Sequence, residues 1–293
     1  MSSSSAFSYD AQTAGHTDWR PALSASRAKE YQRCPLQYRL HVVDGLTDPP
    51  SKATTLGTLV HAVLEHLFEV PAPQRTQEYA NDLVDPLWKE MQEKKPAVSE
   101  LFASSDELSS WLDSAYTLLN SYFQVEDPRW LAPASTEEHI VASTPDGIRL
   151  RGFIDRIDRA PSGALRVVDY KTGRAPSPRF QDDALFQMRF YALLLQLTHI
   201  LPARTQLLYL KTGQVLTFDP EPEDMAHFLG DIQRLWERIE ADAQRGTFSP
   251  RKNPLCRWCG VQSLCPLFGG VTPPLPPERV ERLLTTRSQS SSH

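Results

Sequence analysis

The sequence contains no run of about 18 apolar residues and only four cysteines among its 293 residues. The first absence argues against a transmembrane helix, because a helix that spans a bilayer needs roughly 20 consecutive apolar residues. Residues 1–10 are rich in serine and lack both a basic start and an apolar stretch, so we expect no secretory signal. These absences predict a cytoplasmic protein that does not contact a membrane.

The rest of the composition is that of an ordinary globular protein, with 40% hydrophobic and 23% charged residues. The length allows one large domain or two small ones. The net charge of −5 is a mild argument against nucleic-acid binding, but the charges are unevenly distributed. Residues 149–189 hold nine basic and five acidic residues, residues 20–39 hold five basic and one acidic, and residues 63–138 hold 5 basic and 15 acidic. A basic footprint of this kind fits a polyanionic substrate, and a solvated mixed surface is the alternative.

Both ends of the chain have the composition of disordered segments. Residues 1–20 are rich in serine, and residues 272–293 are rich in proline and serine, so neither offers enough apolar surface for a core. Between them we find no internal repeat. We therefore expect a single domain over residues 21–271, with a helical insertion at about residues 71–130 and a cysteine-rich segment at residues 250–271.

Periodic patterns predict an α/β fold. Apolar residues at helical spacing predict a helix over residues 56–70 that ends at Pro71. Further helices are expected at 24–41 (interrupted near Cys34-Pro35), 75–94 (kinked or split by Pro86), 105–124, 180–198 and 222–244. Strands are expected near 136–143, 148–157, 164–171, 204–211 and 214–219. This order predicts a mixed central sheet flanked by helices, with added helical material.

The end of the expected strand 164–171 carries the strongest signal for function. Asp169 and Lys171 point to the same face, because side chains alternate along a strand. An acid and a lysine at the tip of an apolar strand suit a metal ion and a phosphate, since hard cations prefer carboxylate oxygens. Antiparallel pairing can bring Asp155, near the end of the preceding strand, beside Asp169. Two neighbouring carboxylates repel unless a cation or a proton joins them, so we predict a divalent-metal site, with ordinary strand-end acids as the alternative.

Three further groups are candidates for this site. Lys171 could orient or deprotonate a metal-bound water and counter charge on phosphorus; a weak surface ion pair with Asp169 is the alternative. Gln187 and Tyr191 lie four residues apart on an expected helix and share a face, so they could look into a cleft or into solvent. His61 lies on the apolar helix, where a lone histidine is usually a core or helix-edge residue.

The cysteines have the spacing of metal ligands. Cys256, Cys259 and Cys265 form C-x2-C-x5-C, and a cytoplasmic chain does not normally keep disulfides. Cys34 is the only other thiol. Four thiolates suit either a tetrahedral zinc or an iron–sulfur cluster; the alternative is a buried Cys34 and a trio that binds nothing. A shared centre would be structural, and chelation would then destabilise the fold.

Six short segments occur in an order typical of one protein family. They are L-S-A-S-R with C-P-L-Q-Y, G-T-L-V-H, G-F-I-D-R-I-D, V-V-D-Y-K-T-G, Q-M-R-F-Y, and C-R-W-C with a later C-P. From about Leu23 to Pro266 the chain resembles the RecB-type branch of the PD-(D/E)xK nucleases in its iron–sulfur form. Related members are the nuclease domains of AddAB-type helicase–nucleases and the CRISPR-associated adaptation nucleases. One departure from the superfamily pattern is that Ile154, rather than a proline, precedes Asp155.

The resemblance implies a restriction-endonuclease-like core with added N-terminal helices and a C-terminal cysteine cluster. The groups that would hold Mg²⁺ or Mn²⁺ are His61, Asp155, Asp169 and the backbone carbonyl of Tyr170. Lys171 would position or activate water, and Gln187 and Tyr191 would contact DNA near the metal. A [4Fe–4S] cluster, with zinc as the alternative occupant, would be bound by Cys34, Cys256, Cys259 and Cys265.

The resemblance also implies a metal-dependent DNA nuclease, an exonuclease that acts on single-stranded DNA ends in repair or recombination. No G-x-x-x-x-G-K-[ST] helicase signature occurs, so the protein would stand alone or join a separate helicase. One alternative is a non-catalytic nucleic-acid-binding subunit of a helicase–nuclease complex. Another is an enzyme with a structural zinc that acts on a different phosphoester. The intact Asp155, Asp169 and Lys171 favour the enzyme.

Overall fold

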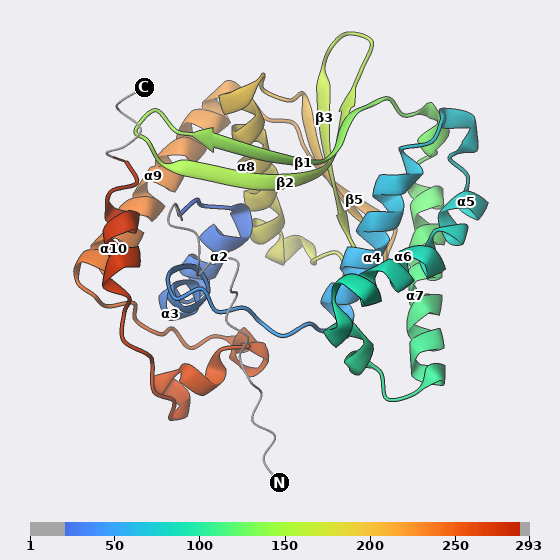
Figure 1. Ribbon diagram of the computed structural model, residues 1–293. Coiled ribbons are helices and arrows are strands. Elements are labelled where there is room, and N and C mark those ends of the chain that lie inside the picture. Colours follow the sequence, from blue (N-terminus) through green and yellow to red (C-terminus); the bar gives the residue numbers. More distant parts are fainter. Residues whose placement is uncertain (1–20, 288–293) are drawn as a thin grey trace. The chain divides into compact units, whose positions relative to one another are not determined.

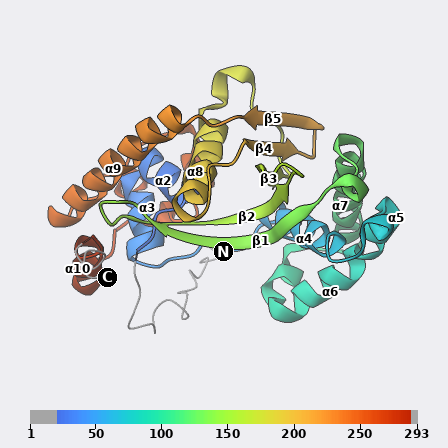
Figure 2. The same cartoon turned by 90° about the horizontal axis from the view of Figure 1, so that it is seen from above.

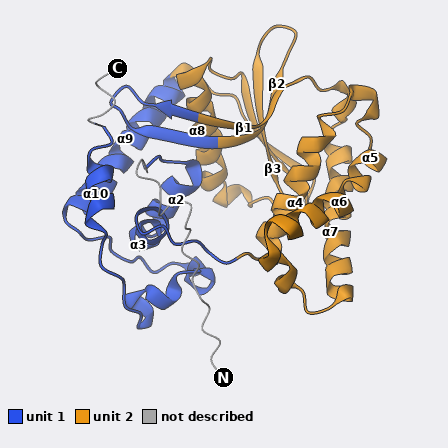
Figure 3. Cartoon of the chain, viewed as in Figure 1, with its two compact units in different colours: residues 1–49, 141–152, 223–293 blue, residues 50–140, 153–222 orange. Residues whose placement is uncertain are grey.

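The computed structural model describes residues 21–287, so the disorder expected for residues 1–20 and 288–293 lies outside the described residues. The chain forms two compact units, coloured separately in Figure 3. Unit 1 comprises Met1–Pro49, Val141–Gly152 and Glu223–His293, and unit 2 comprises Pro50–Ile140 and Phe153–Pro222. No helix in the described part of the chain combines the length and apolarity that a membrane span requires.

A five-stranded sheet has the order β1-β2-β3-β4-β5. Its strands are β1 (Pro133–Ser143), β2 (Arg149–Arg159), β3 (Leu165–Lys171), β4 (Arg204–Tyr209) and β5 (Gln214–Phe218). β3 pairs antiparallel with β2 and parallel with β4, and β4 pairs antiparallel with β5. The prediction of a mixed sheet in an α/β fold is therefore confirmed. Figure 1 shows the strands and the helices that accompany them.

Unit 2 contains five α-helices among its described residues. They are α4 (Lys52–Leu67), α5 (Gln77–Asp82), α6 (Val84–Lys94), α7 (Ser105–Val125) and α8 (Asp182–Thr198). The helix expected over residues 75–94 is split at Leu83, and Pro86 lies in the first turn of α6, where its missing N–H breaks no helical hydrogen bond. Ser51 begins α4 with a capping box that involves Thr54.

The helices of unit 2 bury both faces of β3 and β4. Val168 and Tyr170 share one core with apolar residues of α4, α6 and α7, whereas α8 packs on Leu207 and Tyr209 of β4. Figure 2 shows α8 and the group α4 to α7 on opposite sides of these strands. Because side chains alternate along β3, Asp169 and Lys171 project on the side of α8.

Unit 1 contains four α-helices and a π-helical turn in its described part. They are α2 (Ala25–Arg33), α3 (Pro35–Tyr38), the π turn (Arg39–Val43), α9 (Pro222–Gln244) and α10 (Pro277–Leu284). The interruption predicted near Cys34 is present, because Cys34 is extended and Pro35 begins α3. The prediction of a disordered tail is wrong over α10, which buries Leu283 and whose Arg279 donates to the carbonyl of Val43.

Candidate active site

Three ligand-type side chains meet where α4 approaches β1 and β2. The ligand atoms of His61, Glu137 and Asp155 all lie within 4.8 Å of one another. His61 Nδ1 is 3.3 Å from Asp155 Oδ1 and 3.9 Å from Glu137 Oε1. His61 Nε2 lies 3.0 Å from the carbonyl oxygen of Tyr170. The structure thus brings together the expected His61, Asp155 and Tyr170 carbonyl, and it adds Glu137.

The sequence of α4 explains why His61 faces this group. Leu59, Val60, Val63 and Leu64 are fully buried in the core, so the opposite stripe of the helix is left for polar contacts. His61 lies one turn after Gly57, on that stripe. A Cβ on Gly57 would come within 3.4 Å of Thr172 Oγ1, so the first turn of α4 passes close to the segment that follows β3. This close approach sets His61 beside the end of β3.

Glu137 is the site residue that our sequence reasoning missed. Its φ of +45° lies in the left-handed region, which a residue with a side chain rarely adopts. Such backbone conformations occur preferentially at functional sites, where the surrounding structure sustains them. The irregularity leaves no mark in the sequence, since Glu137 reads there as one more acid in a strand.

The three side chains form a site that attracts positive charge. Burial, together with the neighbouring charge of Asp155, raises the pKa of Glu137 to about 7, although His61 opposes the shift. Burial alone would lower the pKa of His61, but the hydrogen bond and charge of Asp155 outweigh it and raise the pKa to about 9. The carboxylates therefore stabilise a cation between them.

The donor set fits a divalent metal ion. Two carboxylates and a backbone carbonyl supply oxygen atoms, which are the ligands that Mg²⁺ and Mn²⁺ prefer. The single imidazole adds one softer nitrogen donor, which suits Mn²⁺ better than Mg²⁺. The buried Asp155 is held in place because its Oδ2 accepts the backbone N–H of Tyr170 at 2.6 Å, and such outer contacts orient metal ligands.

Asp169 forms an adjacent polar network on the side of α8. Lys171 Nζ lies 2.6 Å from Asp169 Oδ2, while Gln187 Nε2 and the Tyr191 hydroxyl donate to Oδ1 at 2.9 and 3.2 Å. Gln187 also donates to the Tyr191 hydroxyl at 3.0 Å. Burial raises the pKa of Asp169, Lys171 opposes the shift, and the nearby Asp155 adds to it. Gln187 and Tyr191 therefore look towards the strand end rather than into solvent.

The four cysteines all lie in unit 1 as half-buried free thiols. Cys34, Cys259 and Cys265 pack against a small cluster of buried residues formed by Leu36, Leu40 and Val261. Burial raises the pKa of the Cys259 thiol, and the Cys34 and Cys256 thiols are close enough to raise it further. Backbone N–H groups donate to two sulfurs: Arg251 to Cys34 Sγ at 3.4 Å and Asn253 to Cys256 Sγ at 3.3 Å.

The segment that carries three of these cysteines has almost no core of its own. Residues 250–271 form only short 3-10 turns, and Val261 is the single buried residue among them. A Cβ on Gly270 would lie 2.2 Å from the carbonyl oxygen of Ser263, so the chain returns tightly on itself beside Cys265. Burial of apolar surface cannot hold such a segment, whereas a metal centre bound by its thiolates could.

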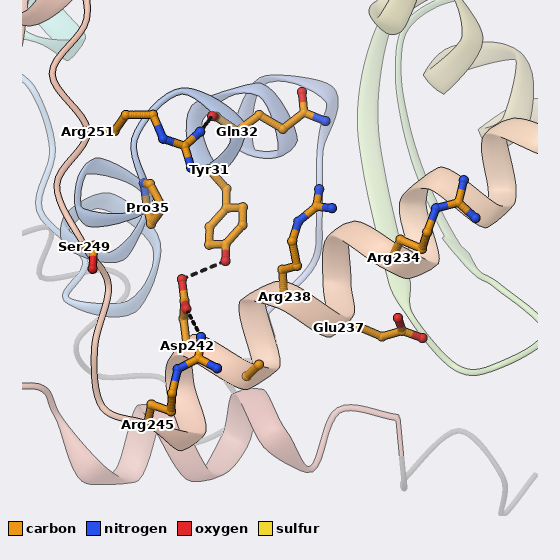
Figure 4. A pocket seen from close by; sticks show the side chains of 11 residues that line it. Tyr31, Gln32, Pro35, Arg234, Glu237, Arg238, Asp242, Arg245, Ser249 and Arg251 are labelled. Atoms are coloured by element: carbon orange, nitrogen blue, oxygen red, sulfur yellow. Dashed lines mark hydrogen bonds and ion pairs between the residues drawn. The ribbon is translucent and has the colours of Figure 1, made fainter.

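A cavity of about 700 Å³ in unit 1 is lined by four arginines: Arg234, Arg238, Arg245 and Arg251. Figure 4 shows Arg238, Arg245 and Arg251 around Tyr31, whose hydroxyl donates to Asp242 at 2.7 Å. Asp242 also pairs with Arg245, and Glu237 is the other acid in the wall. Within residues 21–287, Arg238 has no carboxylate partner. The wall carries two more positive than negative groups, so it attracts anions.

Part of the predicted basic footprint is wrong. Arg156 is fully buried and pairs with Glu126 and Asp158 at 2.6 and 3.0 Å. Arg166 pairs with the same two acids. Both arginines balance carboxylates in unit 2, and the fully buried Arg156 presents no charge to a ligand. Sequence counting could not separate them from exposed arginines, because burial depends on strand register.

Comparisons with known proteins agree with this fold. The model of the PD-(D/E)XK nuclease superfamily matches residues 22–266. The Gene 69 protein of Mycobacterium phage D29 is 27% identical over 273 residues, with 85% of this chain and 97% of that protein covered. One of the ATP-dependent helicase/deoxyribonuclease subunits of Streptococcus uberis is 27% identical over 167 residues, which cover 54% of this chain and 14% of that protein.

A solved structure supports the fold. A protein from Eubacterium rectale that carries the provisional name exonuclease superposes with a TM-score of 0.52 at 15% identity, over 86% of this chain and 90% of that one. The family match extends over most of the described residues and includes α4, β1, β2, β3 and α8, which supply the candidate site. This chain therefore belongs to the PD-(D/E)XK nuclease superfamily.

Proposed function

We propose that the protein is a divalent-metal-dependent deoxyribonuclease that degrades single-stranded DNA from an end. The observation that carries the proposal is the group of His61, Glu137 and Asp155 within 4.8 Å, beside the Asp169–Lys171 pair. Membership of a nuclease superfamily supports phosphodiester hydrolysis. DNA and cleavage from an end are supported by the names of the Streptococcus uberis and Eubacterium rectale proteins.

Each side chain has a defined task in this proposal. His61, Glu137 and Asp155, with Asp169 and the Tyr170 carbonyl nearby, would hold Mg²⁺ or Mn²⁺. The bound ion supplies a Lewis acid for the phosphate and lowers the pKa of an attacking water. The Lys171 ammonium would stabilise negative charge on the phosphate oxygens. Gln187 and Tyr191 would hold the Asp169 carboxylate in place, because both donate hydrogen bonds to its Oδ1.

The arginine-lined cavity supports a polyanionic substrate. Arg234 and Arg238 lie on α9, and Arg245 directly follows its last residue. The spacings of four and seven residues place the three arginines along one face of the helix. At 1.5 Å per residue the row is about 16 Å long, which is longer than one small anion and suits an extended phosphate chain.

The biological role of the protein would be in DNA repair or recombination, alone or with a separate helicase.

We also propose that Cys34, Cys256, Cys259 and Cys265 hold a [4Fe–4S] cluster, with zinc as the alternative. The scarcity of buried side chains in residues 250–271 supports a structural centre, because thiolate ligation then replaces a hydrophobic core. Anaerobically purified protein should be brown and contain iron and acid-labile sulfide in equal amounts, about four of each per chain. Colourless protein that contains zinc and no iron would overturn the cluster in favour of zinc.

The nuclease proposal is tested with end-labelled single- and double-stranded DNA in Mg²⁺, Mn²⁺ or EDTA. We expect metal-dependent shortening of the single strand. Lys171→Ala should lower the rate by about 10²- to 10⁴-fold, the loss typical of a group that acts on developing charge. Lys171→Gln retains a donor for Asp169 and controls for folding, and Lys94→Ala on α6 removes an exposed lysine far along the chain. Folded, metal-supplied protein that leaves every substrate intact would support a non-catalytic binding subunit instead.

A further inference from the structure

Two exposed aromatic rings stack on one another in unit 2. The rings of His139 on β1 and Phe153 on β2 lie 4.4 Å apart between centroids, at an interplanar angle of 19°. Phe153 is 56% exposed, and His139 is exposed as well. A single exposed phenylalanine needs no explanation. A stacked, solvent-facing pair of rings differs from a single exposed ring, because it presents a flat apolar surface in a fixed orientation.

The pair lies beside the carboxylate site on the same two strands. Phe153 precedes Asp155 by two residues, so both side chains project from the same face of β2, and Ile154 between them is fully buried on the other face. Two strand residues span about 7 Å. His139 follows Glu137 by two residues on β1. On each of the two strands, a ring thus lies two residues from a carboxylate of the candidate site.

Other exposed aromatics of the chain lack this arrangement. Trp130, Phe180 and Trp258 each occupy the last position of a short 3-10 turn. Over the described range none of the three stacks on another aromatic ring. Phe153 is instead fixed by the hydrogen-bonded strand on which it lies, and that rigidity gives a ligand a preformed face.

We infer that the His139–Phe153 pair is a stacking platform for one nucleobase of the substrate strand, next to the phosphate that the carboxylate site would hold. This inference rests on the proposed nuclease function. A base is joined to its phosphate through one sugar, so a platform about 7 Å from Asp155 is within reach of a nucleotide bound there. The face of the pair is the size of one base rather than of a protein interface.

The platform also defines the class of substrate. Stacking on an aromatic ring accepts every base, because each base has a π face, so the platform confers no sequence preference. A base inside a duplex is already stacked and paired, and its removal from the stack costs a few kcal/mol. The platform therefore favours an unpaired strand over a duplex.

The first measurement is binding of a fluorescent single-stranded oligonucleotide in Ca²⁺, with melting curves for every variant. Phe153→Ala should weaken binding by about 5- to 100-fold, the loss typical of one base–aromatic stack, and Phe153→Trp should restore it. His139→Ala should have a smaller effect, since the outer face of Phe153 remains. Trp130→Ala, which removes another exposed ring of unit 2, should leave affinity unchanged.

A set of oligonucleotides with one abasic site at successive positions locates the stacked base. In the wild type, an abasic site at one position should weaken binding by the same factor as Phe153→Ala. In the Phe153→Ala variant, an abasic site at that position should weaken binding no further. Equal losses at every position in both proteins would overturn the platform. Cleavage of the same oligonucleotides by the wild type in Mn²⁺ tests the nuclease proposal separately. If the wild type cleaves but the abasic site and Phe153→Ala weaken binding independently, the platform is wrong and the nuclease proposal stands. If the two changes are non-additive but nothing is cleaved, the nuclease proposal is wrong and the platform stands.

Discussion

The two units are stabilised in different ways. Unit 2 has a large core in which α4, α6 and α7 bury β3 and β4, and its polar chemistry lies at the ends of strands that this core already holds. The cysteine segment of unit 1, residues 250–271, has short turns and one buried residue. The fold of unit 2 therefore positions its site, whereas in the cysteine segment the proposed metal site would maintain the fold.

Because of this difference, the loss of a carboxylate in unit 2 and the loss of a thiolate in residues 250–271 should have different consequences. A carboxylate removed from the strand ends of unit 2 relieves repulsion between neighbouring acids, so the unit should remain folded. A thiolate removed from the cysteine segment would take away the proposed metal cross-link, which burial does not replace. Substitutions in the two units should consequently act on activity in one case and on local stability in the other.

The largest local change, the opening of a whole segment, is expected from Cys265→Ser. Loss of one thiolate should release iron and open residues 250–271, so that trypsin cleaves after Arg251, Lys252 and Arg257 at least about tenfold faster than in the wild type, because proteolysis follows the population of the opened state. The cleavage products are identified by mass spectrometry. Ser263→Ala alters the same segment and no ligand, so it serves as the control. If trypsin cleaves both variants at the wild-type rate, the segment is held by something other than a metal centre.

A loss of global stability is expected from Arg156→Met in unit 2. The fully buried guanidinium balances Glu126 and Asp158, and its removal leaves two buried acids without this partner, which should cost about 3–5 kcal/mol of unfolding free energy. Urea unfolding followed by circular dichroism measures the change, and the iron content should not fall. Arg159→Met, at an exposed position of the same strand, should change stability by less than about 0.5 kcal/mol. Equal effects of the two substitutions would show that the buried network contributes little.

The smallest effect is expected from Arg238→Glu in the cavity of unit 1. A charge reversal in the arginine row should weaken binding of single-stranded DNA by about tenfold at low salt and lower the slope of log K against log salt by roughly 1 to 2. Titrations at several salt concentrations measure both quantities. Lys94→Glu on α6 makes the same change in charge outside the cavity. A similar loss in both variants would mean that overall charge, and not the cavity, attracts the strand.

The sequence predicted the secondary structure well where local patterns are strong. The helix expected over residues 222–244 matches α9, and the strand expected at 164–171 matches β3 within one residue. Local signals failed where long-range contacts decide. The prediction of a disordered tail missed α10, whose Leu283 is buried and whose Arg279 donates to Val43, and the charge count over residues 149–189 included the buried Arg156.

The sequence by itself determined the order of elements, the apolar root and charged tip of β3, and the spacing of the cysteines, because periodicity and alternation act over a few neighbouring residues. Only the tertiary structure brought Glu137 to His61 and Asp155, joined Gln187 and Tyr191 to Asp169, and stacked His139 on Phe153. Those contacts join residues far apart in the chain. They depend on strand pairing and on the backbone angle of a single residue, and a local pattern records neither.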